Sequence, residues 1–234
     1  MKLAVRSTLP WLLVASVLVA PGQLEAQRIP SPFAFVEERQ EAGPYVGYMS
    51  ASTGRFGYGP SGGVMLGTRY GIDLSGPLGL EVVAGAVKGT RDVVNPARPE
   101  GDRVIGEADV LLTTVDLRLR LSATGARTWH GLVPFLTFGG GIVIDHEEPS
   151  LTETAVLDPD EVFELGTKFF GVIGPGVKWH VTRRLAVRTD FGFSLWKLDT
   201  PDGWGDPTLA IPSVPESGEW TSGLSLTGSV LFRW

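Results

Sequence analysis

Apolar and polar positions alternate along the last segment of the chain, residues 223–234. One face of this segment carries Leu224, Leu226, Val230, Phe232 and Trp234, and the other carries Ser225, Thr227, Ser229 and Arg233. A period of two residues is the signature of a β-strand, because successive side chains point to opposite faces of a sheet. The segment is therefore predicted to be a strand with one apolar face that includes the final tryptophan.

The same alternation recurs along most of the chain and predicts eight strands. Their expected ranges are residues 44–52, 62–74, 77–88, 104–121, 132–144, 166–181, 184–198 and 221–234. The pattern is strongest over residues 184–198, where the apolar Val187 and Phe191 alternate with the charged Arg188 and Asp190. The second, fourth and sixth connections between strands are short, whereas the other four are mostly longer and polar.

This alternation of short and long connections predicts the fold. Transmembrane barrels have an even number of antiparallel strands, with short periplasmic turns and longer extracellular loops. We therefore predict an all-β, eight-stranded, antiparallel up-and-down transmembrane β-barrel over residues 44–234. Residues 27–43, which contain Pro30 and Pro32, show no strand alternation and are predicted to form a periplasmic N-terminal tail.

The N-terminal segment has the pattern of an export signal. Lys2 and Arg6 precede an apolar run over residues 9–20, which is followed by a Pro21-Gly22 break and by Leu24-Glu25-Ala26. These features predict a signal peptide over residues 1–26 and a mature chain that starts at Gln27. The alternative of a membrane anchor is disfavoured, because a spanning helix needs about 20 apolar residues.

Composition narrows the function further. The chain has no cysteine, so it forms no disulfides and carries no lipid on a cysteine. Loss of residues 1–26 removes Lys2, Arg6 and Glu25, which leaves 18 basic and 25 acidic residues and a formal charge of −7. An acidic protein lacks the basic surface that nucleic-acid binding requires. No nucleic-acid partner and no cofactor are therefore expected.

Alternation alone does not say which face of each strand points outward, because soluble barrels turn their apolar face inward. Three features favour lipid on the outside: the signal peptide, the uneven loop lengths and the aromatic residues near strand ends. These aromatic residues are Tyr45, Tyr48, Tyr70, Trp179, Trp196 and Trp234. The soluble alternative is a periplasmic calycin-like carrier of small apolar ligands, which would have an apolar interior.

With lipid outside, the charged faces of the strands line the lumen. The expected lumen charges are Arg69, Asp73, Glu81, Asp116, Arg118, Arg120, Lys178, Arg184, Arg188, Asp190 and Arg233. Side chains just fill the interior of an eight-stranded barrel, and buried charges persist only when they are paired. We therefore predict a plugged lumen with paired charges. The alternative is an ion or solute path along the basic residues of the strands at 104–121 and 184–198.

Two of the long connections are candidate surface sites. The connection at residues 145–164 carries eight carboxylates and no basic residue: Asp145, Glu147, Glu148, Glu153, Asp158, Asp160, Glu161 and Glu164. Oxygen-rich loops suit hard cations, so divalent cations are predicted partners here, although no EF-hand spacing is present and a solvated acidic loop is the alternative. The connection at 199–220 contains Trp204 and Trp220, which either form a recognition surface or pack on each other.

The C-terminal pattern resembles the closing strand of small bacterial outer-membrane β-barrels, such as the OmpA transmembrane domain and the OmpX and OmpW types. In that superfamily the barrel-assembly machinery reads an aromatic C-terminus, which Phe232 and Trp234 match here. The resemblance implies a monomeric barrel in outer-membrane lipid and lipopolysaccharide, with a structural or surface-interaction role. An OmpW-like narrow channel for small apolar or ionic solutes is the transport alternative.

The resemblance does not predict an enzyme. Some outer-membrane barrels modify lipid A with a histidine that takes the proton of a serine hydroxyl. The three histidines are His130, His146 and His180, and none lies in a motif that resembles those enzymes. His146, with Asp145 beside it and Ser150 nearby, would be the base if the chain were such an enzyme.

Overall fold

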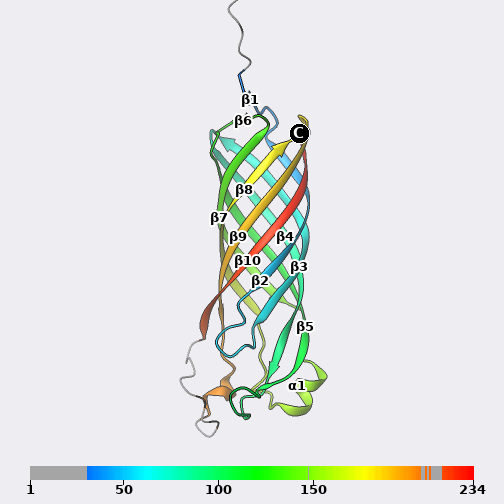
Figure 1. Ribbon diagram of the computed structural model, residues 1–234, viewed down its shortest axis with the longest axis vertical. Coiled ribbons are helices and arrows are strands. Elements are labelled where there is room, and N and C mark those ends of the chain that lie inside the picture. The colour runs from blue at the N-terminus through cyan, green and yellow to red at the C-terminus, as the bar shows by residue number, and fades with distance from the viewer. Residues whose placement is uncertain (1–30, 147, 207–208, 210, 212–217) are drawn as a thin grey trace, which may run out of the picture. The chain divides into compact units, whose positions relative to one another are not determined.

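Eight long strands close into an antiparallel barrel in the computed structural model (Figure 1). The strands are β2 (Gln40–Ala51), β3 (Pro60–Ser75), β4 (Leu78–Val94), β5 (Val104–Ser122), β7 (Leu132–Asp145), β8 (Thr167–His180), β9 (Leu185–Leu198) and β10 (Glu219–Arg233). The structure describes residues 31–146, 148–206, 209, 211 and 218–234. Each strand pairs with its neighbour along the chain, and the pairing of β2 with β10 closes the ring. The predicted eight-stranded fold is confirmed.

Three connections lie at one end of the barrel, at residues 76–77, 123–131 and 181–184, and the first and third of them are short. We call this end the short-turn end; it also holds residue 234 (Figure 1). The four connections at the opposite end are residues 52–59, 95–103, 146–166 and 199–218, and we call it the long-loop end. The two longest connections lie at the long-loop end, as expected from the sequence, but the connection at 123–131, which was expected to be short, is as long as the one at 95–103.

The segment before the predicted first strand differs from expectation. Residues 27–43 were predicted to contain no strand, but β2 begins at Gln40 and a short strand, β1 (Phe33–Phe35), precedes it. β1 pairs with β6 (Arg127–Trp129), which lies in the connection between β5 and β7. A three-residue strand is too short to show a period, so neither β1 nor β6 was predicted.

Backbone hydrogen bonds join the start of the first barrel strand, β2, to the end of the last, β10. Gln40 N–H donates to Trp234 O at 3.2 Å, and Trp234 N–H donates to Gln40 O at 3.1 Å. Further along this seam, Tyr45 lies opposite Ser229. Cβ atoms at Gly67 on β3 and Gly85 on β4 would overlap the Tyr45 ring and hydroxyl, so the absence of side chains there lets the tyrosine lie along the inner wall over these two strands.

The outer surface of the barrel is apolar. The outward positions of β10 from residue 224 to residue 234 are Leu, Leu, Gly, Val, Phe and Trp, and Leu226 is 57% exposed. Ten residues of a tilted strand rise about 25 Å, the height of the apolar band of membrane barrels. Exposed aromatic side chains mark both edges of this band: Tyr70, Trp129, Trp179 and Trp234 at the short-turn end, and Tyr48, Phe169 and Trp220 at the long-loop end.

The long-loop end contains the two short helical elements of the described chain. α1 (Leu151–Val156) lies in the connection that was predicted to be an acidic loop. Its first turn is closed by a capping box, in which Glu153 N–H donates to Ser150 Oγ and Ser150 N–H donates to Glu153 Oε2. A 3₁₀ helix, η1 (Asp202–Gly205), lies between β9 and β10. Neither helix is long and apolar enough to cross a membrane.

Candidate functional site

The lumen is the candidate site, because the inward side chains of all eight strands meet there. It has two layers: charged residues fill the half near the short-turn end, and apolar and aromatic residues fill the half near the long-loop end. The inward charges are Glu41, Arg69, Asp73, Glu81, Asp116, Arg118, Arg120, Lys178, Arg188, Asp190 and Arg233. We call this set the charge network.

Glu81 on β4 lies at the centre of the charge network and is 1% exposed. It forms an ion pair with Arg188, and Arg120 Nη1 donates to Glu81 Oε1 at 2.6 Å. Arg188 Nε also donates to Asp190 Oδ1 at 2.9 Å, and its guanidinium lies 4.3 Å from the centre of the Phe135 ring. These contacts join β4, β5, β7 and β9 across the lumen.

Two further pairs extend the charge network towards the middle of the barrel. Arg69 Nη1 donates to Asp190 Oδ2 at 2.8 Å, and Arg69 Nη2 donates to Thr227 Oγ1 at 3.3 Å. Arg118 Nη2 donates to Asp116 Oδ2 at 3.0 Å. Ion pairing inside the lumen, as predicted from the mixed signs of these residues, is present in the structure.

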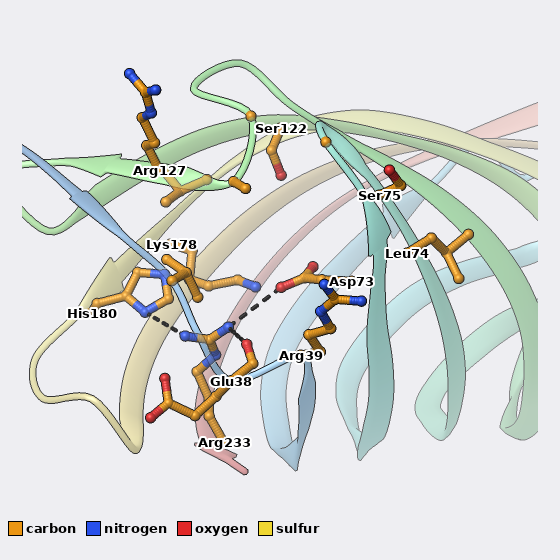
Figure 2. A pocket seen from close by; sticks show the side chains of 15 residues that line it. Glu38, Arg39, Asp73, Leu74, Ser75, Ser122, Arg127, Lys178, His180 and Arg233 are labelled. Atoms are coloured by element: carbon orange, nitrogen blue, oxygen red, sulfur yellow. Dashed lines mark hydrogen bonds and ion pairs between the residues drawn. The ribbon is translucent and has the colours of Figure 1, made fainter.

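At the short-turn end, the charge network opens onto a cavity of about 100 Å³ (Figure 2). Arg233 Nη2 donates to the backbone carbonyl of Glu38 at 2.5 Å, so the segment before β2 lies over the mouth. Arg233 Nη1 lies 3.0 Å from His180 Nδ1. Because a guanidinium only donates, Nδ1 must be the acceptor, which assigns the His180 proton to Nε2. Lys178 Nζ donates to Glu41 Oε2 at 2.6 Å.

The structure changes two members of the predicted lumen set. Arg184 is exposed in the turn between β8 and β9, so its assignment to the lumen is wrong; β9 begins one residue later than predicted. Glu41 is 2% exposed inside the barrel and was missed, because the first strand was predicted to start at residue 44. The signal was available: Glu41 lies on the same face as Tyr45 and Met49, two inward residues of β2.

The outer half of the lumen is closed by aromatic residues from three long connections. Tyr58, Phe163 and Trp204 pack together, with ring centres 4.7 Å apart for Tyr58 and Phe163 and 5.2 Å apart for Tyr58 and Trp204. Trp204 is 1% exposed, and its Nε1 donates to Glu161 O at 3.1 Å. Burial raises the pKa of the Tyr58 hydroxyl. We call Phe56, Tyr58, Phe163 and Trp204 the aromatic plug.

The aromatic plug is tied to the barrel wall by a buried ion pair. Arg91 Nη1 on β4 lies 2.6 Å from Glu153 Oε1 on α1, and the Arg91 guanidinium lies 5.7 Å from the centre of the Phe163 ring. Glu153 was predicted to be part of a loop without basic residues. Its counterion comes instead from a strand that lies much earlier in the sequence, which local sequence analysis does not reveal.

A small chamber lies between the aromatic plug and the charge network. Its volume is about 60 Å³, and its lining includes Met49, Leu112, Phe170 and Trp196. For comparison, a dry cavity of about 150 Å³ accommodates benzene. The chamber therefore has less room than a small aromatic ligand needs, which disfavours the OmpW-like path for apolar solutes.

Among the described residues, the other predicted sites do not form a metal-binding or catalytic arrangement. Within the described chain, no three His, Asp or Glu residues gather in a way that would hold a metal ion; Glu147 lies outside that part. His146 is exposed, and the Ser150 hydroxyl caps α1 instead of contacting it. His130 lies against Trp129, with ring centres 5.1 Å apart. The described residues therefore include no group that would bind the predicted divalent cations, which stay a prediction.

The two faces of the barrel distinguish the membrane protein from the soluble carrier. Outward apolar side chains, such as Leu66 on β3 and Leu117 on β5, are exposed, whereas Arg120 and Arg188 are buried inside. Soluble proteins rarely expose apolar patches of more than a few hundred Å², so a continuous apolar band requires lipid around it. The predicted orientation is confirmed, and the barrel is an integral membrane protein of the outer-membrane type.

Several solved structures are similar to this chain at low sequence identity. The N-terminal β-barrel domain of Pseudomonas aeruginosa OprF is 16% identical, with a TM-score of 0.40. The match covers 85% of this chain and 100% of that domain. Neisserial surface protein A is 13% identical, with a TM-score of 0.43, covering 87% and 98%. A major outer membrane protein from Thermus thermophilus is 14% identical, with a TM-score of 0.37, covering 83% and 99%. No family model and no curated protein matches the chain.

Proposed function

We propose that this protein is an outer-membrane barrel with a structural or surface-interaction role and a lumen closed to solutes. The short-turn end faces the periplasm and the long loops face outward, as in other membrane barrels with this loop asymmetry. The observation that carries the proposal is the double closure of the lumen, by the charge network around Glu81 and by the aromatic plug around Trp204.

Conductance tests this proposal directly. The refolded mature chain, inserted into planar bilayers in potassium chloride, is expected to give no stable conductance steps, because two packed layers separate the ends of the lumen. Regular steps of one size would instead favour the narrow-channel alternative. Fractionation of expressing cells is expected to find the protein in the outer membrane. On gels, the folded form should migrate faster before heating than after it.

A charge on the outer face is expected to destabilise the barrel. Val230 lies on the outward face of β10 near the middle of the run from Leu224 to Trp234, so Val230→Arg should cost about 2–4 kcal/mol of unfolding free energy in lipid vesicles. Urea titration followed by tryptophan fluorescence measures this cost. Leu151→Arg is the control, because Leu151 is 89% exposed on α1, outside the apolar band. Equal stability of the two variants would contradict the membrane orientation.

Export and assembly complete the proposal. Residues 1–26 act as the signal peptide, and the mature chain begins at Gln27; these residues lie outside the described part of the chain. The barrel-assembly machinery recognises Phe232 and Trp234, which are exposed on the outward face and stack with ring centres 5.9 Å apart. The barrel then functions as a monomer among outer-membrane lipid and lipopolysaccharide.

A further inference from the structure

The charges of the lumen do not balance. The charge network contains six cationic side chains and five carboxylates; the cations are Arg69, Arg118, Arg120, Lys178, Arg188 and Arg233, and the carboxylates are Glu41, Asp73, Glu81, Asp116 and Asp190. Three ion pairs account for half of the cations: Arg69 with Asp190, Arg118 with Asp116, and Arg188 with Glu81. One positive charge is left over among the remaining five side chains.

This excess charge lies at the short-turn end. Glu41 and Asp73 are the remaining carboxylates, and they are shared by Arg120, Lys178 and Arg233. Arg233 is the least well paired: its Nη2 lies 3.3 Å from Asp73 Oδ2, and its Nε lies 3.3 Å from Glu41 Oε2 without a hydrogen bond. A buried cation without a full counterion is unfavourable, so this end of the lumen attracts negative charge.

The cavity at the same end provides room for a counterion. It has a volume of about 100 Å³, and its polar lining includes Lys178, Arg233, Arg39 and Asp73, with Ser75 and Ser122 also present (Figure 2). Lys178 and Arg233 are 3% and 1% exposed, so their charges are only weakly screened by water. Basic side chains with nearby hydroxyl donors are the groups that bind oxyanions in proteins.

Glu38 is the nearest alternative source of negative charge. It lines the cavity, but it contacts Arg233 through its backbone carbonyl. Among the described residues, its carboxylate forms no ion pair with Lys178 or Arg233. A bound anion from outside the chain could therefore neutralise the excess positive charge.

We propose that this cavity binds a single oxyanion, the carboxylate or phosphate group of a periplasmic molecule. The group would accept hydrogen bonds from Lys178 and Arg233 and bring the charge network to neutrality. A free anion and a phospholipid headgroup at the inner leaflet both offer this chemistry. Anion binding itself requires only the folded barrel, whereas the periplasmic source of the anion rests on the proposed orientation.

The experiment uses the mature chain refolded in an uncharged maltoside detergent. It is titrated with inorganic phosphate at constant ionic strength, and binding is followed by calorimetry. Wild type is expected to bind phosphate saturably, and Lys178→Met is expected to weaken binding by about tenfold or more, the effect of one charge-assisted hydrogen bond. Arg184→Gln is the matched control, because it removes a positive charge from the exposed turn at the same end of the barrel. Its affinity should equal that of wild type.

A second arm separates the two sources of the anion. The same three proteins are placed in bicelles with and without phosphatidylglycerol, and phosphorus NMR reports headgroup binding. Lys178-dependent binding of phosphate supports a free anion, and Lys178-dependent binding of the headgroup alone supports the lipid. Equal binding by wild type and Lys178→Met, or no binding in either arm, overturns the proposal. Should Lys178→Met fail to refold, Lys178→Gln, which removes the same charge from the cavity lining but keeps a polar side chain, carries the same expectation.

Discussion

Replacing Glu81 with glutamine is expected to destabilise the barrel by about 3–5 kcal/mol, the usual cost of breaking a buried ion pair. Glu81 is the shared acceptor of Arg120 and Arg188, and all three side chains are about 1% exposed or less. Loss of its charge leaves two buried guanidinium groups with fewer counterions. Urea titration of the refolded barrel in lipid vesicles measures the change in unfolding free energy.

A control and a double variant separate this effect from general damage. Glu107→Gln removes a carboxylate from β5 that belongs to no ion pair of the charge network, and it should leave the stability unchanged. Arg188→Met combined with Glu81→Met removes both partners of the central pair and should cost less than the sum of the single changes. A loss of less than about 1 kcal/mol in Glu81→Gln would mean that water, rather than Arg120 and Arg188, satisfies this carboxylate.

The membrane environment explains why the sequence predicted so much of this fold. A strand of this barrel has lipid on one side and a charged lumen on the other, so its alternation is unusually clear; Val187 and Arg188 on β9 show it well. The eight barrel strands and all of the predicted lumen residues except Arg184 follow from that single rule. The error at Arg184 arose at a strand end, where a period of two gives no sign that the strand has stopped.

Contacts between distant segments could not be predicted in this way. The pairing of Arg91 with Glu153 depends on how a loop folds back over the barrel mouth, and no local pattern encodes that path. The same holds for the aromatic plug, because Tyr58 and Trp204 lie in connections without periodicity. The strand periodicity of β2 did extend to Glu41, but the sequence analysis began that strand too late, at residue 44.

Trp204 is expected to control how firmly the outer mouth is closed. Trp204→Ala removes a 1% exposed side chain that contacts Tyr58 and Phe56 and donates to Glu161 O. Removal of a buried tryptophan costs about 3–5 kcal/mol, because the cavity that it leaves is only partly refilled. The loss falls on the long loops, whereas the barrel below keeps its paired strands and its charge network.

Hydrogen exchange distinguishes this local loss from global unfolding. If the plug opens independently of the barrel, backbone amides at residues 52–59 should exchange about a hundredfold faster or more in Trp204→Ala, while those of β9 keep their protection. Trp220→Ala is the matched control, because Trp220 is 73% exposed on the outer face of β10. Faster exchange in both variants would show that the loops respond to any lost aromatic residue. Uniformly faster exchange that includes β9 would show that the plug and the barrel unfold as one unit.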